Sequence, residues 1–142
     1  MKEVTLVIPA KKEPNALPIV LNELKNHYPN INIMIVMQKD DQETFKAIKD
    51  YDCKIVFQTG RGYGNAILEG IKQSVTTYTC VFYADGSTDP KYISIMLNKT
   101  RGENLDVVFG SRYEKGAGSF DDDLITRVGN FFFTFLGNFL LR

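Results

Sequence analysis

Short apolar runs alternate with amphipathic segments along most of the chain. The runs lie at residues 4–9, 32–37, 53–57, 79–84 and 106–110, and the first of them is almost continuously apolar and rich in β-branched residues. Strands of a parallel sheet have this pattern when helices cover both faces of the sheet. The runs therefore predict five strands, of which the first is central.

The segments between these runs have helical periodicity. Residues 16–25 carry leucine and valine at helical spacing, and a helix is expected after each of the next three strands as well. Ile67, Ile71 and Val75 share one face of the helix that follows the third strand. Alternation of strands and helices indicates βαβ units with right-handed crossovers. We expect a three-layer α/β/α fold with a mostly parallel sheet.

The last part of the chain has a different pattern. Three acidic residues at 121–123 precede residues 124–142, where apolar side chains cover most of the helical circumference. The acids favour a helix N-terminus over a metal cluster. Such an apolar helix packs on another part of a protein or lies in a membrane interface. We divide the chain into an α/β domain at residues 1–120 and the start of a helix at residues 121–142, which we expect to continue in a longer protein.

Composition narrows the class of protein. The chain has 142 residues, of which 44% are hydrophobic and 24% charged, so it suits one domain with a core. Lys+Arg and Asp+Glu are balanced at 17 each, so no overall field favours nucleic acid. We expect neither a signal peptide nor a complete membrane span. Cys53 and Cys80 lie in strand runs and are expected to be reduced core thiols, as in a cytoplasmic protein.

The fourth apolar run ends abruptly in a polar turn, residues 84–90, with the sequence Ala-Asp-Gly-Ser-Thr-Asp-Pro. Ligands of open α/β folds bind beyond the carboxyl ends of the strands. Asp89 stands directly before a proline and is best explained as a helix cap, whereas Asp85 has no such role. A Mg²⁺ or Mn²⁺ ion that bridges a carboxylate and a diphosphate needs a residue of this kind. A plain turn aspartate is the alternative.

A glycine-rich loop follows the third apolar run at residues 60–66, with the sequence Gly-Arg-Gly-Tyr-Gly-Asn-Ala. Its amides can approach a phosphate at the start of a helix, and Arg61 adds a planar charge that suits phosphate oxygens. The pattern alone is weak, because it lacks both the spacing of the dinucleotide fingerprint and the Lys-Ser/Thr of ATP-binding loops. It predicts either an anion site or a plain strand-to-helix turn.

Four segments, in order, resemble family 2 glycosyltransferases, and most of all the dolichol-phosphate mannose synthases and related polyprenyl-phosphate sugar transferases. They are residues 5–13 (Thr-Leu-Val-Ile-Pro-Ala-Lys-Lys-Glu), the glycine-rich loop, residues 83–90, and residues 106–113 with Arg127 and Asn130 beyond. The resemblance covers nearly the whole chain. It implies a glycosyltransferase A fold and an enzyme that transfers sugar from a nucleoside-diphosphate sugar to a polyprenyl phosphate.

The same resemblance assigns roles by position. The nucleotide sugar would be bound by Pro9, Ala10, Glu13, Asp40, Arg61, Gly62, Asn65, Ala84 and Asp85. Asp85 and Ser87 would hold Mg²⁺ or Mn²⁺ on the diphosphate. Asp85 and Arg112 would be the catalytic pair, with Arg112 meeting an acceptor or donor phosphate. The implied reaction is metal-dependent and inverting, and it needs no histidine, because a polyprenyl phosphate is already ionised and has only to be aligned.

The chain departs from the family pattern at three places. Tyr83 stands where the first carboxylate of an Asp-x-Asp motif belongs. Residues 38–39 are Gln-Lys instead of an acidic pair, so Asp40 or Asp41 would replace the usual nucleoside-contacting acid. Residues 11–12 are Lys-Lys instead of Tyr-Asn. Weak metal use, an unusual donor, and a non-catalytic module that binds a nucleotide sugar or a partner all stay open.

The expected partners follow from the resemblance and from the apolar tail. They are a nucleoside-diphosphate sugar (a UDP-sugar or GDP-mannose), a polyprenyl phosphate or other lipid acceptor, and a membrane surface contacted peripherally by residues 124–142. Nucleic acid is not among them. We expect the protein at the cytoplasmic face of a membrane, in glycan or cell-envelope biosynthesis. A sugar-phosphate nucleotidyltransferase is disfavoured, because the first strand does not end in a glycine-rich turn.

Overall fold

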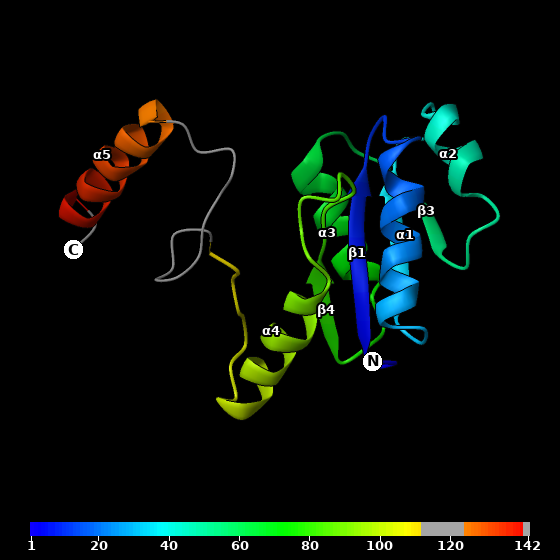
Figure 1. Cartoon of the computed structure of the whole chain (residues 1–142). Coiled ribbons are helices and arrows are strands. Elements are labelled where there is room, and N and C mark those ends of the chain that lie inside the picture. The colour runs from blue at the N-terminus through cyan, green and yellow to red at the C-terminus, as the bar shows by residue number, and fades with distance from the viewer. Residues whose placement is uncertain (112–123, 141–142) are drawn as a thin grey trace. The chain divides into compact units, whose positions relative to one another are not determined.

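The computed structural model of the protein describes residues 1–111 and 124–140. The chain forms two compact units, Met1–Asp106 and Val107–Arg142. Strands and helices alternate through the first unit (Figure 1). Its strands are β1 (Val4–Ala10), β2 (Asn32–Met37), β3 (Lys54–Phe57) and β4 (Tyr78–Val81), and its helices are α1 (Ala16–His27), α2 (Gln42–Ile48), α3 (Tyr63–Gln73) and α4 (Lys91–Gly102). The domain division predicted between residues 120 and 121 falls outside the described residues.

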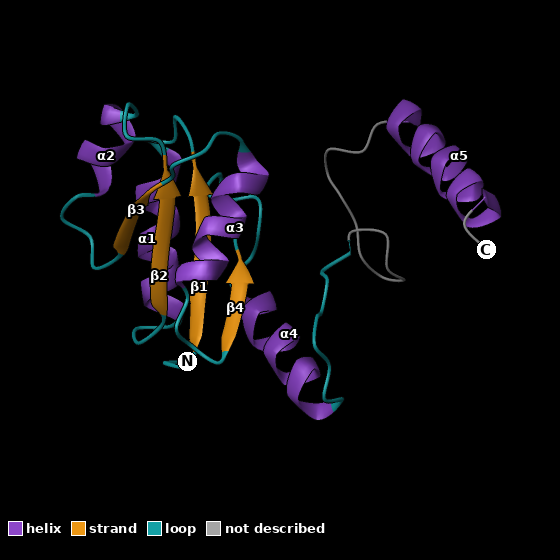
Figure 2. Ribbon diagram, turned by 180° about the vertical axis from the view of Figure 1, so that it is seen from behind, coloured by secondary structure: helices purple, strands orange, loops and turns teal. Residues whose placement is uncertain are grey.

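The four strands form one parallel sheet in the order β3-β2-β1-β4. Neighbouring residues of a strand point to opposite faces, so Leu6 and Ile8 join one buried cluster and Val7 joins another. Side chains of α1, α2 and α4 pack into the first cluster, while α3 covers the other face (Figure 2). The predicted three-layer α/β/α fold with a parallel sheet is therefore confirmed.

Helix α3 packs on the sheet through its small residues. Gly70 is buried, and a Cβ atom at this position would collide with a methyl group of Val7 and lie 3.1 Å from one of Val36. Ile71, on the apolar face that the sequence predicted, is exposed instead, and Val75 lies beyond the end of the helix and is exposed as well. A close approach between backbones decides which side of this helix meets the sheet, and bulky apolar residues do not fit there.

The predicted fifth strand is wrong for this chain. Residues 106–110 have no regular secondary structure, and Val107 and Phe109 are exposed. A strand is stabilised by pairing with a neighbour, so an apolar β-branched run is necessary but not sufficient. Within Met1–Asp106 the sheet ends at β4, whose strand neighbour is β1.

The second unit contains α5 (Leu124–Leu140). Phe131, Phe135 and Phe139 recur every four residues along this helix, so they share one face, and all three side chains are exposed. Within the described part of the chain, no helix combines the length and the apolar character needed to cross a membrane.

Candidate functional site

A long cleft of about 1170 Å³ runs along the carboxyl ends of the four strands, lined entirely by residues of the first compact unit. The parallel register pairs Ala10 with Met37 and Met37 with Phe57, so β1, β2 and β3 end at the same edge. The loops that follow the strands therefore meet there. Open α/β sheets bind their ligands at this edge.

Most of the residues that the sequence singles out line this cleft. They are Pro9, Ala10, Glu13, Asp40, Arg61, Gly62, Ala84 and Asp85, together with Tyr83. Asn65 and Ser87 are not part of the lining, and Arg112 lies outside the described residues. The positions are thus brought together, while the role of each residue stays a prediction.

The stretch after β4 keeps the alternation of a strand. Phe82 donates its amide to the carbonyl of Val7 at 3.0 Å. Phe82 and Ala84 are buried in the core, Phe82 to 1% exposure, whereas Tyr83 and Asp85 are exposed at the cleft. The apolar run therefore delivers two side chains, one phenol and one carboxylate, to the same side of the cleft.

Asp85 is held by its own turn. The amide of Ser87 donates to Asp85 Oδ1 at 2.9 Å, and the hydroxyl of Ser87 hydrogen-bonds the same carboxylate. These bonds lower the pKa of Asp85, so the group is ionised at neutral pH. Gly86 between them has φ of +79°, which favours glycine. Two hydrogen bonds use only part of the acceptor capacity of a carboxylate, so Asp85 can still bind a cation.

Among the described residues, the Asp85 carboxylate has little support from other side chains that could bind the same metal ion. They contain no cluster of three or more His, Cys, Asp or Glu side chains that could hold a metal. The phenol of Tyr83 stands where a second carboxylate was expected. Magnesium in nucleotide sites often uses one or two carboxylates together with substrate phosphates. Asp85 therefore fits a Mg²⁺ or Mn²⁺ that a diphosphate holds in part, and Ser87 as a further ligand stays a prediction.

The glycine-rich loop already binds an anion of the chain itself. The carboxylate of Glu69 accepts hydrogen bonds from the Thr59 amide at 2.9 and 3.1 Å, the Thr59 hydroxyl at 2.8 Å and the Gly60 amide at 3.2 Å. These bonds, with that of the Thr59 hydroxyl foremost, lower the pKa of Glu69. An internal carboxylate thus occupies the amides at the start of the loop, and a phosphate site at the glycines and Arg61 stays a prediction.

Two glutamines brace the same loop. Gln38 and Gln58 each donate from Nε2 to the carbonyl of Gly60 at 3.1 Å, and Gln58 also donates to Asn65 Oδ1 at 3.1 Å. A Cβ atom on Gly60 would lie 2.5 Å from the Asn65 amide nitrogen. Gln38 and Asn65 therefore hold the loop in place. The sequence pattern marked Gln38 only as a missing acid, and Gln58 not at all.

Asp41 joins the loop after β1 to helix α2. Its Oδ2 accepts from the Lys12 amide at 2.6 Å, and its Oδ1 accepts from the Thr44 amide at 3.2 Å, which caps the helix. Partial burial acts to raise the pKa of Asp41, but the bonds from Lys12 and Thr44 outweigh it and lower the pKa. Each oxygen accepts one bond that supports the fold, so Asp41 has a structural role, and a nucleoside contact by Asp40 or Asp41 stays a prediction.

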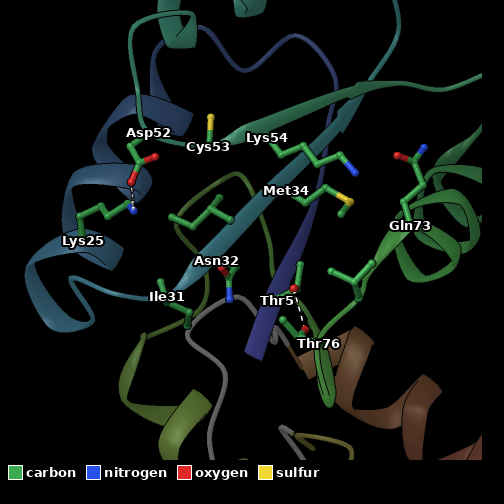
Figure 3. Close-up of a pocket in the computed structure, with 12 residues that line it drawn as sticks. Thr5, Lys25, Ile31, Asn32, Met34, Asp52, Cys53, Lys54, Gln73 and Thr76 are labelled. Carbon is green, nitrogen blue, oxygen red and sulfur yellow. Dashed lines mark hydrogen bonds and ion pairs between the residues drawn. The ribbon is translucent and has the colours of Figure 1, made fainter. Parts of the chain in front are cut away.

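The opposite edge of the sheet offers less chemistry. A smaller hollow of about 300 Å³ lies there (Figure 3). Four of its polar side chains are paired with one another, Lys25 with Asp52 at 2.7 Å and Thr5 with Thr76 at 2.7 Å. His27, the single histidine of the sequence, ends α1 and donates from Nδ1 to the Glu23 carbonyl at 3.0 Å. The histidine is therefore a helix-end residue, as predicted, and is absent from the cleft lining.

Comparison with known proteins adds a second line of observation. The sequence profile of the family described as glycosyl transferase family 2 matches residues 5–142. A UDP-N-acetylglucosamine–dolichyl-phosphate N-acetylglucosaminyltransferase from Methanococcus voltae is 26% identical over 159 aligned residues, which cover 95% of this chain and 63% of that protein.

Two mycobacterial proteins are similar as well. Uncharacterized glycosyltransferases from Mycobacterium bovis and Mycobacterium tuberculosis are each 27% identical over 113 residues, which cover 77% of this chain and 48% of theirs. The chain therefore spans about half to two thirds of the length of these curated relatives.

Proposed function

Because the chain belongs to glycosyl transferase family 2, we propose that it transfers a sugar from a UDP-sugar or GDP-mannose to a polyprenyl or dolichyl phosphate. Its parallel sheet with flanking helices is that of the glycosyltransferase A fold. One observation carries the proposal: the cleft at the strand ends combines the carboxylate of Asp85 with the guanidinium of Arg61. The name of the relative from Methanococcus voltae supports a lipid phosphate as acceptor.

Different residues of the cleft can bind different parts of the nucleotide sugar. Pro9 and Ala10 line the cleft and would contact the nucleoside, and the nearby carboxylates of Glu13 and Asp40 could accept hydrogen bonds from ribose or base. Arg61 offers planar donors to phosphate oxygens. A Mg²⁺ or Mn²⁺ ion bound with Asp85 would neutralise charge on the leaving diphosphate.

The acceptor chemistry agrees with the absence of histidine from the cleft lining. A polyprenyl phosphate is ionised at neutral pH, so the cleft has to align its oxygen rather than deprotonate it. A single displacement by that oxygen inverts the configuration at the sugar carbon. Arg112, the expected partner of an acceptor or donor phosphate, belongs to the proposal as a prediction.

Calorimetric titration of the 142-residue chain with UDP-sugars and GDP-mannose in the presence of Mn²⁺ tests the donor half of the proposal. Heat of binding is expected with at least one donor, with a Kd in roughly the micromolar to millimolar range. Asp85→Ala should weaken this binding. Asp89→Ala is its matched acidic control, because Asp89 lies outside the cleft lining and accepts a hydrogen bond from the Lys91 amide at 2.9 Å in the turn before α4. An absence of heat with every donor would contradict the proposed function.

Tyr83 also favours a second candidate, a non-catalytic module of the same fold that binds a nucleotide sugar or a partner. It removes the second carboxylate from the diphosphate end of the cleft. The two candidates differ in turnover. Product in the lipid phase after incubation with donor and polyprenyl phosphate supports the transferase, whereas heat of binding without product supports the module.

Helix α5 supports contact with a membrane surface, which would bring the cleft and a lipid acceptor into one compartment at the cytoplasmic face. The exposed face of Phe131, Phe135 and Phe139 is suited to the boundary between headgroups and acyl chains. We expect the chain to sediment with anionic phospholipid vesicles and Phe135→Ser to weaken this binding about tenfold. Asn138→Ser on the same helix is the control. Equal sedimentation of both variants and the unmodified chain would rule out this contact.

A further inference from the structure

Two tyrosines form a parallel pair inside the cleft. Tyr63 is the first residue of α3, and Tyr83 follows β4. Their ring centroids lie 6.4 Å apart and their planes differ by 8°, the geometry of an offset stack. The side chains are 51% and 50% exposed, and both line the cleft. Each ring fixes the orientation of the other, while about half of each side chain faces solvent.

This pair is not a piece of the hydrophobic core. Neither ring belongs to the two buried clusters on the faces of the sheet. One face of each ring is directed at the other tyrosine, and about half of each side chain stays exposed at the cleft. A ligand in the cleft can therefore contact the pair.

The phenol of Tyr63 lies close enough to Asp85 to be affected by its charge. Asp85 and Tyr83 both line the cleft. Burial raises the pKa of Tyr63, and so do Tyr83, which accepts a hydrogen bond from the Tyr63 phenol, and the charge of Asp85, so this phenol keeps its proton at neutral pH. A protonated phenol donates one hydrogen bond and carries no charge.

Neutral hydrogen-bond donors can help to bind an anion in this cleft, because its lining has an excess of negative charge. The carboxylates of the lining outnumber its cations, as Glu13, Asp40, Asp41, Glu43 and Asp85 stand against Lys11, Lys12 and Arg61. Basic side chains alone therefore do not neutralise a diphosphate there. Among the described lining residues that follow β4, Asp85 is the one carboxylate. A metal ion held by one carboxylate is anchored mainly by the diphosphate itself.

We propose that the hydroxyl of Tyr83, which the Tyr63 hydroxyl orients, donates a hydrogen bond to the diphosphate of the nucleotide. This bond takes the place of the contact that a second carboxylate would make through a bound cation. Binding of a nucleoside diphosphate to this chain then depends only weakly on divalent metal. The inference rests on the proposed function, because it takes the cleft to bind a nucleoside diphosphate. It adds Tyr63 as a positioning residue and makes Tyr83 a binding residue.

The test compares the affinity of the 142-residue chain for UDP and for GDP in excess Mn²⁺ and in EDTA. We expect the two conditions to differ by less than about fivefold for the nucleotide that binds, and Tyr83→Phe or Tyr63→Phe to weaken binding in EDTA about tenfold. These variants keep the stacked rings and lose only a hydroxyl. Tyr83→Asp should make binding depend on Mn²⁺, with a ratio of about tenfold or more between the conditions.

Tyr92→Phe is the matched control, because Tyr92 is a half-exposed tyrosine on α4 outside the cleft lining. Its affinity should equal that of the unmodified chain. A loss of more than about fivefold in EDTA for the unmodified chain, or unchanged binding in both hydroxyl variants, overturns the inference and leaves the proposed function standing. If neither nucleotide binds in either condition, the proposed function fails and the inference fails with it.

Discussion

Replacing Asp85 by alanine is expected to slow sugar transfer by about 100- to 1,000-fold, the usual effect of removing a group that stabilises charge in a transition state. Asp85 is ionised and lines the cleft, and under the proposed function it would hold the metal ion on the diphosphate. Its loss should act mainly on the departure of the nucleotide. Transfer of radiolabelled sugar to polyprenyl phosphate, with the extracted lipid counted, measures the effect.

Two further variants separate the charge of Asp85 from its place in the turn. Asp85→Asn keeps an oxygen for the Ser87 amide and removes the negative charge, so it should be nearly as slow as the alanine variant. Asp89→Ala, which alters an acid of the same loop outside the cleft lining, should retain most activity. Activity of Asp85→Ala within about fivefold of the unmodified chain would remove Asp85 from the mechanism.

Phe82→Ala is expected to cost about 3–5 kcal/mol of unfolding free energy, as is typical for truncation of a buried aromatic side chain. Phe82 is 1% exposed and is among the largest fully buried side chains. The cavity would open beneath Tyr83 and Asp85, so nucleotide binding should weaken as well. Urea unfolding followed by circular dichroism measures the change in stability.

The chain offers a matched control for this substitution. Phe109 is 86% exposed, so Phe109→Ala removes the same atoms without leaving a cavity and should change stability by less than about 0.5 kcal/mol. A loss below about 1 kcal/mol for Phe82→Ala would mean that this position does not anchor the stretch after β4.

The architecture and the position of the cleft could be predicted from the sequence because both depend on periodic patterns. The apolar run at residues 32–37 coincides with β2, and the run at 4–9 differs from β1 by one residue. Once the sheet is parallel, the loops after its strands must meet at one edge. The order of the elements therefore predicts that Arg61 and Asp85 lie at the same edge, and the family resemblance added Pro9 to them.

Side-chain partners could not be predicted in this way. Glu69 reaches back to the amide of Thr59, and Tyr63 stacks on Tyr83, but no spacing rule links the members of either pair. Both contacts depend on how α3 sits against the sheet, which the glycine at position 70 determines. The prediction of a fifth strand was wrong for a related reason. Apolar composition is a property of the local sequence, whereas strand pairing depends on a distant part of the chain.

The alternation after β4 limits how this site can change over time. Phe82 and Ala84 face inward while Tyr83 and Asp85 face the cleft, so the chemistry of the site depends on counting residues from the end of the strand. Inserting or deleting one residue before Asp85 would turn the acid into the core and present an apolar side chain to the ligand. Substitution at positions 83 and 85 can therefore diversify the site, whereas a change of length there would destroy it.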